Sequence, residues 1–585
     1  MTISNRKALC LSLLSSSVLC AVTLALSGPA QAQTASQITK HTYAPTMIKP
    51  VGHGVTLPSG GGLVAPAGAD TLFVTPSGLD VSGGVPAMFS ETAKIEASIK
   101  NRRITAADLF KAASALEKAY AKAGYLLVRV SLPPQTIKDG NRLKLVVTKG
   151  FIEAIDTSAL SERVEPLVGR FLANLVGRND VTRSDIERRL LLAGDTPGLH
   201  LKSVLKAGQT PGSTVIVVDG RHDAVTASVS LDNALSDEMG RWSVGLNAQF
   251  NSLLGFGEVV YGQISGYPSL DDEAVFDSDP RNRQLAAGFS VPLGTGGAWL
   301  GMEAVDSRTH PTSSVGFTVP DHFQRFTTRL GYHWIRSRNA NLSSTISFDV
   351  ASELQQTDVG GSRNDFTEDE LRIVRFTQAG DIFPDWGGHL SASATLSVGL
   401  DALGARHGTT SLPLSRNGAS PDFAKLDLNA RFSHAFGTHF GAFSLAAKAQ
   451  TSFGEPLVSS EQMGIAGMEW LSAFTNGDLA GDSALAVRAE WSMPEKLPTM
   501  FDWQSDIGGA VSPYLFAAAG VMSLEQPTAQ EHDVTRAMSV GAGLRIGLSQ
   551  KDSARTSALT LEYAYGDADH AGGQSRFNIA LQASF

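Results

Sequence analysis

Few residues in this 585-residue sequence combine types and spacing that could do chemistry. Gly481-Asp-Ser-Ala-Leu has the form of an esterase motif with Ser483 as nucleophile, but no matching Asp-x-x-His follows it. The run GAGLRIG, which begins at Gly541, has no strand-turn-helix context for a phosphate-binding loop. We therefore predict that the protein is not an enzyme and has neither catalytic nor cofactor-binding residues.

Metal ligands are equally sparse. The acidic run DDEAVFDSD from Asp271 could hold a calcium ion, but the pattern favours a solvated external loop. His41 and His53 lie in a stretch rich in Pro and Gly, with no Cys or carboxylate at ligand spacing. We predict no metal site.

Composition narrows the class of protein. Charged residues make up 18% of the chain, against about 25% in an average soluble domain, and there are 58 glycines. The net charge of -9, without a Lys/Arg stripe, argues against a nucleic-acid partner. A chain of this length should contain two or more domains.

Residues 1–32 have the features of a signal peptide. Arg6 and Lys7 precede an apolar stretch that runs to Leu26, and Ala30-Gln31-Ala32 predicts cleavage between Ala32 and Gln33. An uncleaved N-terminal anchor is the less favoured alternative. Cys10 and Cys20, the two cysteines of the sequence, both lie in this segment, so the exported chain cannot form disulfides.

The last three-fifths of the chain, residues 223–585, predict an all-β transmembrane barrel of sixteen antiparallel strands. No later apolar run is long enough for a membrane helix, and a closed barrel is the other structure that satisfies its backbone in lipid. Segments such as RWSVGLNAQF alternate apolar and polar residues, and short turns alternate with long polar loops. One short-side connection, residues 494–512, is longer than this pattern predicts.

The chain ends on such a segment. Phe577, Ile579, Leu581 and Phe585 alternate with polar or small residues, so they should share the lipid-facing side of the last strand. We predict that this strand pairs with the first strand and closes the barrel.

Two small α+β domains are predicted ahead of the barrel, at residues 71–150 and 151–222, behind a flexible lead-in at 33–70. Each combines short strands with a helix that begins at a capping box, Thr105 with Asp108 and Thr182 with Asp185. A small sheet with an open edge can bind an extended peptide as an added strand. Rigid spacers are the alternative for these domains.

The first of these domains resembles a polypeptide-transport-associated (POTRA) domain of the two-partner secretion (TpsB) transporters. The resemblance is carried by the clusters Asp108-Leu109, Gly124-Tyr125, Pro133-Pro134-Gln135 and Asp139-Gly140 and by the closing Lys149-Gly150. It implies two periplasmic POTRA domains, an outer-membrane barrel, an unfolded secreted partner protein recognised in the periplasm, and a last strand read by the barrel-assembly machinery. The residues assigned to client binding are Gly124, Tyr125, Pro133, Pro134, Gln135, Asp139 and Gly140.

The chain departs from the TpsB pattern in one loop. That family carries an arginine on a loop folded into the lumen, paired with an aspartate on a barrel strand. Gly467 and Phe474 fit the loop pattern, but Ser472 stands where the arginine is expected and Ala518 where the aspartate is expected. Because both partners are missing, no buried charge is left uncompensated. Arg488 falls in the following strand, and we do not assign it to the motif.

A long plug helix ahead of the first domain is also not evident, which leaves the variant loop to fill the lumen. The favoured hypothesis is a two-partner secretion pore that moves a client from the periplasm to the cell surface without a nucleotide. The alternatives are an assembly factor of the same superfamily and a passive porin with periplasmic adaptor domains.

Overall fold

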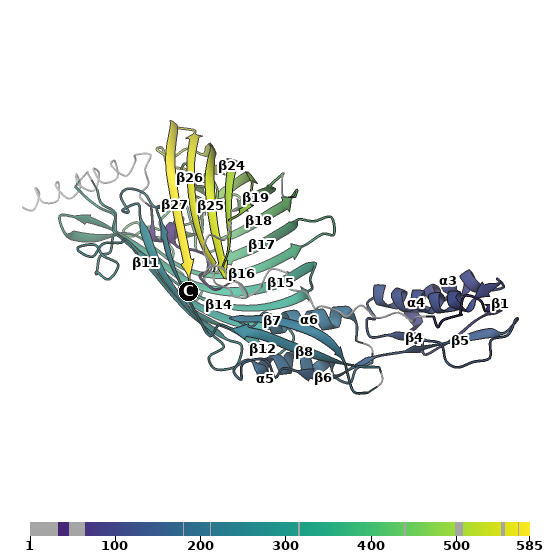
Figure 1. Ribbon diagram of the computed structural model, residues 1–585. Helices are drawn as coiled ribbons and strands as arrows, with labels where there is room; N and C mark the ends of the chain where they lie inside the picture. Colours follow the sequence, from purple (N-terminus) through teal and green to yellow (C-terminus); the bar gives the residue numbers. More distant parts are fainter. Residues whose placement is uncertain are drawn as a thin grey trace, which may run out of the picture.

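The computed structural model describes residues 33–45, 65–179, 181–210, 212–313, 316–437, 440–497, 507–550, 556–570 and 572–585. Figure 1 shows a large curved β-barrel, with one α+β unit beneath it and a second that extends away from it. The predicted signal peptide, with Ala32, lies outside the described residues. Within the ranges given above, no helix has the length and apolar character needed to cross a membrane.

The first α+β unit is a three-stranded sheet, in the order β2-β5-β4, packed by two helices. The predicted capping box is confirmed: the Thr105 side chain accepts from the Asp108 N–H, and the Asp108 side chain accepts from the Thr105 N–H. Leu109, Leu116 and Tyr120 turn to the core of the unit. Its elements are β1 (Phe73–Val74), β2 (Gly78–Ser82), α3 (Phe89–Ile99), β3 (Ile104–Thr105), α4 (Ala106–Lys122), β4 (Arg129–Ser131) and β5 (Arg142–Thr148).

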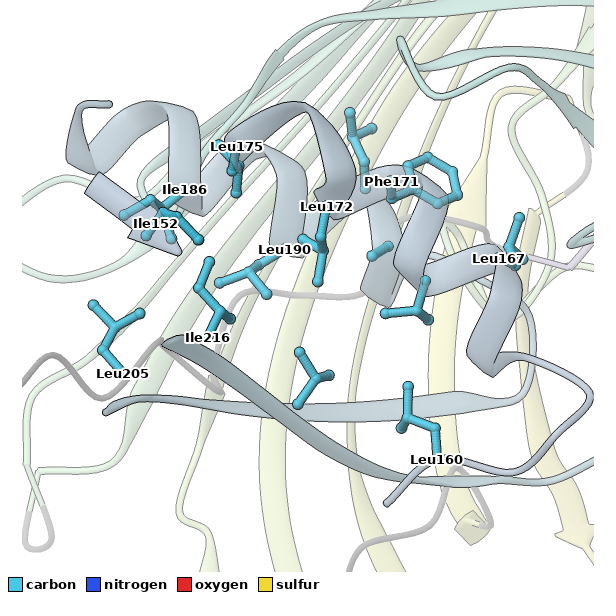
Figure 2. Close-up of a cluster of buried hydrophobic side chains, with 14 of the residues drawn as sticks. Ile152, Leu160, Leu167, Phe171, Leu172, Leu175, Ile186, Leu190, Leu205 and Ile216 are labelled. Carbon is cyan, nitrogen blue, oxygen red and sulfur yellow. The ribbon is translucent and has the colours of Figure 1, made fainter. Parts of the chain in front are cut away.

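The second α+β unit repeats this plan with the sheet order β6-β8-β7. Its capping box, Thr182 with Asp185, is also confirmed. Figure 2 shows Leu172 and Leu190 on the helices, facing Ile216 of the sheet, and Phe171 belongs to the same buried cluster. Its elements are β6 (Phe151–Asp156), α5 (Glu165–Leu172), α6 (Arg183–Gly194), β7 (Leu199–Ala207) and β8 (Ser213–His222).

Antiparallel strands then close into a barrel, as predicted. Within the described residues there are sixteen, counting β22 and β23 as one because both pair with β24. They are β9 (Val225–Asp232), β10 (Ser243–Asn251), β11 (Val259–Gly266), β12 (Asn282–Leu293), β13 (Ala298–Thr309), β14 (Asp321–Arg336), β15 (Ala340–Val359), β16 (Ser362–Ile382), β17 (His389–Gly399), β18 (Ala424–Ala435), β19 (Ala442–Thr451), β22 (Ser483–Ser492), β23 (Glu495–Lys496), β24 (Ile507–Ser523), β25 (Val534–Gln550), β26 (Thr556–Ala568) and β27 (Gly572–Ser584).

The last strand closes the barrel against the first. Leu581 of β27 lies opposite Leu231 of β9, and the Phe585 N–H donates to the Ala227 carbonyl at 2.8 Å. Phe577 and Phe585 are both more than half exposed on the outer wall, whereas Asn578 between them is buried in the lumen. The alternation predicted for this strand therefore separates an apolar outer face from a polar inner face.

Two sequence expectations need correction. The connection expected at 494–512 is shorter, because β23 occupies Glu495–Lys496 and β24 begins at Ile507. Residues 33–45, expected as part of a flexible lead-in, are instead held inside the barrel and form the short helix α2 (Ala35–Ile38). Their composition gives no helical pattern, but polar groups of the barrel wall supply the hydrogen-bond partners that fix them. Residues 46–64 of that lead-in lie outside the described residues.

Candidate functional site: the barrel lumen

The lumen wall is densely charged. The period of two places every second residue of a strand on the inner face, and many of these inward side chains are polar. Many of these side chains are ionisable and nearly inaccessible, which requires partners for their charges. The buried charged residues of the wall include Glu303, Asp321, Arg325, Asp349, Glu353, Asp369, Lys425, Arg488, Glu490 and Glu562.

The N-terminal segment, residues 33–45, binds one side of this wall through its backbone. The Ala35 N–H donates to Asp321 Oδ2 at 2.7 Å, and the Ser36 N–H donates to Glu353 Oε1 at 3.3 Å. Both acceptors lie on neighbouring strands, β14 and β15. Gln33, the predicted first residue after cleavage, is buried here.

A second set of contacts holds the other end of the same segment. Glu303 Oε2 accepts from the Tyr43 N–H at 2.8 Å and from Thr42 Oγ1 at 3.1 Å. Arg325 donates to the carbonyls of Lys40 and His41 at 2.8 and 3.0 Å. The expectation that the variant loop alone fills the lumen is therefore wrong: two separate parts of the chain occupy it.

The second occupant is the lumen loop, residues 452–482, between β19 and β22. Its base is anchored by Glu461, which accepts from Arg375 at 2.7 Å and lies 3.1 Å from Lys425 Nζ. Burial alone would raise the pKa of Glu461, but the neighbouring Arg375 and Lys425 cations hold this pKa well below its ordinary value. Glu461 therefore remains an anion that ties the loop to the strands β16 and β18.

The tip of the lumen loop packs on a surface of small side chains. Ile465, Leu471 and Phe474 are buried against alanines of four strands. Glycines continue this surface: a Cβ at Gly520 would lie 2.8 Å from Ile465 Cδ1, and one at Gly566 would lie 2.6 Å from Ala473 Cβ. These wall positions need small residues because the loop lies directly on them. The alanines are Ala484, Ala486, Ala518, Ala537 and Ala564.

Gly566→Ala should therefore weaken the seating of the lumen loop. The added methyl would force Ala473 and Phe474 away, at a cost of about 1–3 kcal/mol for overpacking. We expect more frequent opening in planar-bilayer recordings. Gly547→Ala is the matched control, since a Cβ there meets nothing within 4 Å. Equal conductance of the two variants would contradict this account of the loop seat.

The residues predicted for the lumen loop lie at its tip and on the wall beneath it. Ser472 is buried, and its carbonyl accepts from Asn578 Nδ2 at 2.8 Å. Ala518 is buried on β24, beneath the loop. Gly467 has φ +97°, a left-handed conformation that favours glycine and turns the loop tip back on itself. Phe474 is buried among the alanines.

Arg488 was not assigned to the loop motif from the sequence, but it contacts the lumen loop. It lies on β22 as expected, directly opposite Ala518 in the register with β24. Its guanidinium is buried, pairs with Glu562 Oε2 of β26 at 2.5 Å, and lies 3.3 Å from Ser472 Oγ. The sequence signal for this residue was a charged side chain at an inward position of an alternating strand. Its partner, Glu562, could not be found in this way, because it is 74 residues away.

The POTRA signature residues have identifiable structural tasks in the first α+β unit. Gly124, with φ +96°, follows α4, and its carbonyl accepts from the Arg183 N–H of the second unit at 2.8 Å. Tyr125 packs edge-on against Tyr120, with ring centroids 6.1 Å apart. Asp139 Oδ1 accepts from the Thr75 N–H at 2.7 Å, and Gly140 has φ +78°.

The Pro-Pro-Gln cluster lies where β4 ends beside β5. Pro133 and Pro134 have no N–H to continue the ladder. The Gln135 side chain pairs with β5 in place of the backbone. Its amide donates to the Lys144 carbonyl at 2.9 Å and accepts from the Lys144 N–H at 2.7 Å. These contacts explain the cluster without a client.

Gln135→Ala should loosen this sheet edge. Loss of two exposed hydrogen bonds should cost about 1–2 kcal/mol, so the Lys144 amide of the full-length protein should exchange hydrogen about tenfold faster. Lys118→Ala, on the exposed side of α4, is the control and should leave this exchange unchanged. Unchanged exchange in Gln135→Ala would show that the side chain does not support β5.

In the part of the chain that the structure describes, no group of three or more His, Cys, Asp or Glu residues is arranged to hold a metal ion. Carboxylates of the acidic run have local partners: Asp277 accepts from the Ala274 N–H at 2.8 Å, and Asp279 pairs with Arg363 at 2.7 Å. Between the N-terminal segment and the lumen loop there remains a cavity of about 620 Å³, whose lining includes Lys40 and Arg545.

A closed sixteen-stranded barrel with an occupied lumen and α+β units at one end defines a pore protein of the bacterial outer membrane, with those units in the periplasm. The chain belongs to the haemolysin secretion/activation protein ShlB/FhaC/HecB family, whose sequence model matches residues 211–546. A model of the ShlB-type POTRA domain matches residues 74–150. The resemblance to two-partner secretion transporters is confirmed.

Individual relatives are distant. HuxB of Haemophilus influenzae (strain 86-028NP), described as a heme/hemopexin transporter protein, is 26% identical over 171 residues. This match spans 29% of the present chain and 30% of HuxB. The structure of CdiB from Escherichia coli aligns over 100% of both chains with a TM-score of 0.67 and 17% identity. CdiB from Acinetobacter baumannii aligns over 98% of both, with a TM-score of 0.57 and 14% identity. These two likenesses concern the fold alone.

Proposed function

We propose that this protein is a two-partner secretion pore, which binds an unfolded secreted protein in the periplasm and passes it through the barrel to the cell surface. The observation that carries the proposal is the occupied lumen. Both occupants are held to the wall by hydrogen bonds, ion pairs and apolar contacts, which can be released and remade. A passive porin would need an open channel instead.

The α+β units are the proposed site of client binding. Each sheet, β2-β5-β4 and β6-β8-β7, has strands at its edges, and an extended client segment can add to such an edge through main-chain hydrogen bonds. We assign the signature residues Gly124 to Gly140 to shaping this unit, and the client contacts to a sheet edge. The exposed Phe577, Leu581 and Phe585 are the proposed recognition signal for the barrel-assembly machinery.

The proposal predicts that a large exported protein depends on this pore. The test starts with a search for a gene that encodes a large exported protein beside this one, and surface delivery of its product is then measured in a deletion strain by immunoblotting of intact cells. Delivery should fall to background and return with the intact gene. Normal delivery in the deletion strain would overturn the assignment of that client.

Channel conductance distinguishes the proposed secretion pore from a passive porin. A steadily open, large conductance of the purified full-length protein would favour a passive porin. A mostly closed channel with brief openings is the result expected for a transporter whose lumen holds two segments of its own chain.

A further inference from the structure

Arg488 contacts two parts of the chain, the barrel wall and the lumen loop. Its Nη2 atom faces the barrel wall and lies 2.5 Å from Glu562 Oε2. Its Nη1 atom faces the lumen loop and donates to the carbonyls of Met468 and Trp470 at 3.3 and 3.1 Å and to Ser472 Oγ at 3.3 Å. One guanidinium thus joins the wall to the loop tip.

The wall supplies the full charge balance of this site. Arg545 pairs with Glu490, and Glu562 also accepts from Tyr514 Oη at 2.7 Å. Two arginines and two glutamates therefore neutralise each other on strands β22, β25 and β26. Toward Arg488 the loop contributes only neutral oxygen atoms, from Met468, Trp470 and Ser472.

The neighbours of Arg488 fix its direction. Its Cζ atom lies 3.7 Å from the centroid of the Phe516 ring, so the guanidinium stacks on an aromatic face. With Glu562 on one side and Phe516 on another, the Nη1 donors keep pointing at the loop tip. A planar fork with fixed donors suits this task, whereas an ammonium group cannot reproduce it.

We propose that Arg488 is the positioning residue that seats the lumen loop, and that the loop can leave without separating an ion pair at this seat. When the tip departs, Arg488 stays compensated by Glu562, and water in the lumen can replace the three lost acceptors. Separating a buried pair would instead leave an uncompensated charge in a site of low polarity. The consequence of this inference, a loop tip that leaves its seat at a low free-energy cost, rests on the proposed pore function. Its test measures the loop itself.

The test uses a reporter beneath the loop. Ala486 is fully buried on β22 under the loop tip, and both native cysteines lie in the predicted signal peptide. Labelling of Ala486→Cys by a water-soluble maleimide in the purified full-length protein therefore reports exposure of the loop seat. Ala351→Cys is the control reporter, because it is buried away from the loop tip, in a cluster with Ala35 of the N-terminal segment and with Leu457 and Val458 at the base of the lumen loop.

Arg488→Lys keeps the charge beside Glu562 but loses the fork, so the labelling rate at position 486 should rise about tenfold or more, as expected for loss of one or two hydrogen bonds. The neutral pair Arg488→Met with Glu562→Leu should raise labelling at least as much, with the barrel still folded by its heat-modifiable migration on gels. Labelling at position 351 should not change.

Two outcomes would overturn the proposal: unchanged protection of position 486 in both variants, or a parallel rise at position 351, which would mean a general loosening of the barrel. Neither readout involves a client. Failure of this test therefore leaves the secretion assignment standing, and failure of secretion leaves the loop seat standing.

Discussion

Ser472→Arg will damage the protein more than Ser472→Arg combined with Ala518→Asp. In the single variant a second guanidinium enters a buried site 3.3 Å from Arg488, with no new anion to balance it. An uncompensated buried charge costs about 3–5 kcal/mol. We expect the lumen loop to leave its seat and channel openings to increase by about two orders of magnitude, since 1.4 kcal/mol corresponds to tenfold.

The added aspartate should restore part of the loss. Ala518 lies opposite Arg488 on the neighbouring strand, beneath the same loop tip, so a carboxylate there can face both arginines. In single-channel recordings the wild type should open least often, the double variant more often and the single variant most often. Surface delivery of the client should be highest for the wild type, lower for the double variant and lowest for the single variant. Equal damage in both variants would mean that positions 472 and 518 do not face each other. The variant Ala518→Asp alone completes the double-mutant cycle for positions 472 and 518.

Asp195→Asn will loosen the second α+β unit from the barrel. Asp195 ends α6 and accepts from Arg336 of β14 through both carboxylate oxygens, at 2.8 and 2.6 Å. Arg336 also donates to Asn341 at 2.8 Å and is almost fully buried. Removal of the negative charge takes away the carboxylate that binds this buried arginine through two oxygens, at a cost of about 3–5 kcal/mol.

The measurement is limited proteolysis and hydrogen exchange of the full-length protein, followed at α6 and at the periplasmic end of β14. Both should lose protection in Asp195→Asn, whereas the neutral pair Asp195→Leu with Arg336→Met should retain most of it, because no charge is then stranded. Equal loss in both would show that the other contacts of α6, such as those of Arg188 with the Gly296 and His333 carbonyls, decide the docking.

Local pattern predicted the parts of this fold that depend on neighbouring residues. The capping boxes at Thr105 and Thr182 formed because the side chains involved are three positions apart. Alternation at a period of two predicted the strands of the barrel and the exposed face of the last strand, because it follows from strand geometry alone. The signal-peptide prediction depends on residues that the structure does not describe.

The lumen was less predictable. Gly467, Ser472 and Phe474 lie on the lumen loop and Ala518 lies on β24 beneath it, and in the sequence only the family resemblance grouped these four positions. Residues 33–45 carry one local signal, the capping box of Thr34 with Gln37 at the start of α2, but their place in the lumen comes from Asp321, Glu353 and Glu303, which are about 260 to 320 positions away. The Pro and Gly residues that suggested a flexible lead-in lie from Pro45 onward, and a local pattern cannot anticipate acceptors on a distant wall.

By itself, the sequence determined that this chain has an exported-protein pattern, two small α+β units and a barrel with an apolar exterior, because helix caps, strand alternation and turn residues act over a few positions. Only the tertiary structure decided what occupies the lumen and which charges compensate one another there. Barrel closure brings Arg488 to Glu562 and Arg375 to Glu461 across 74 and 86 positions. The first pair is set by strand register around the cylinder and the second by the folding of the lumen loop into it, and local periodicity carries no information about either.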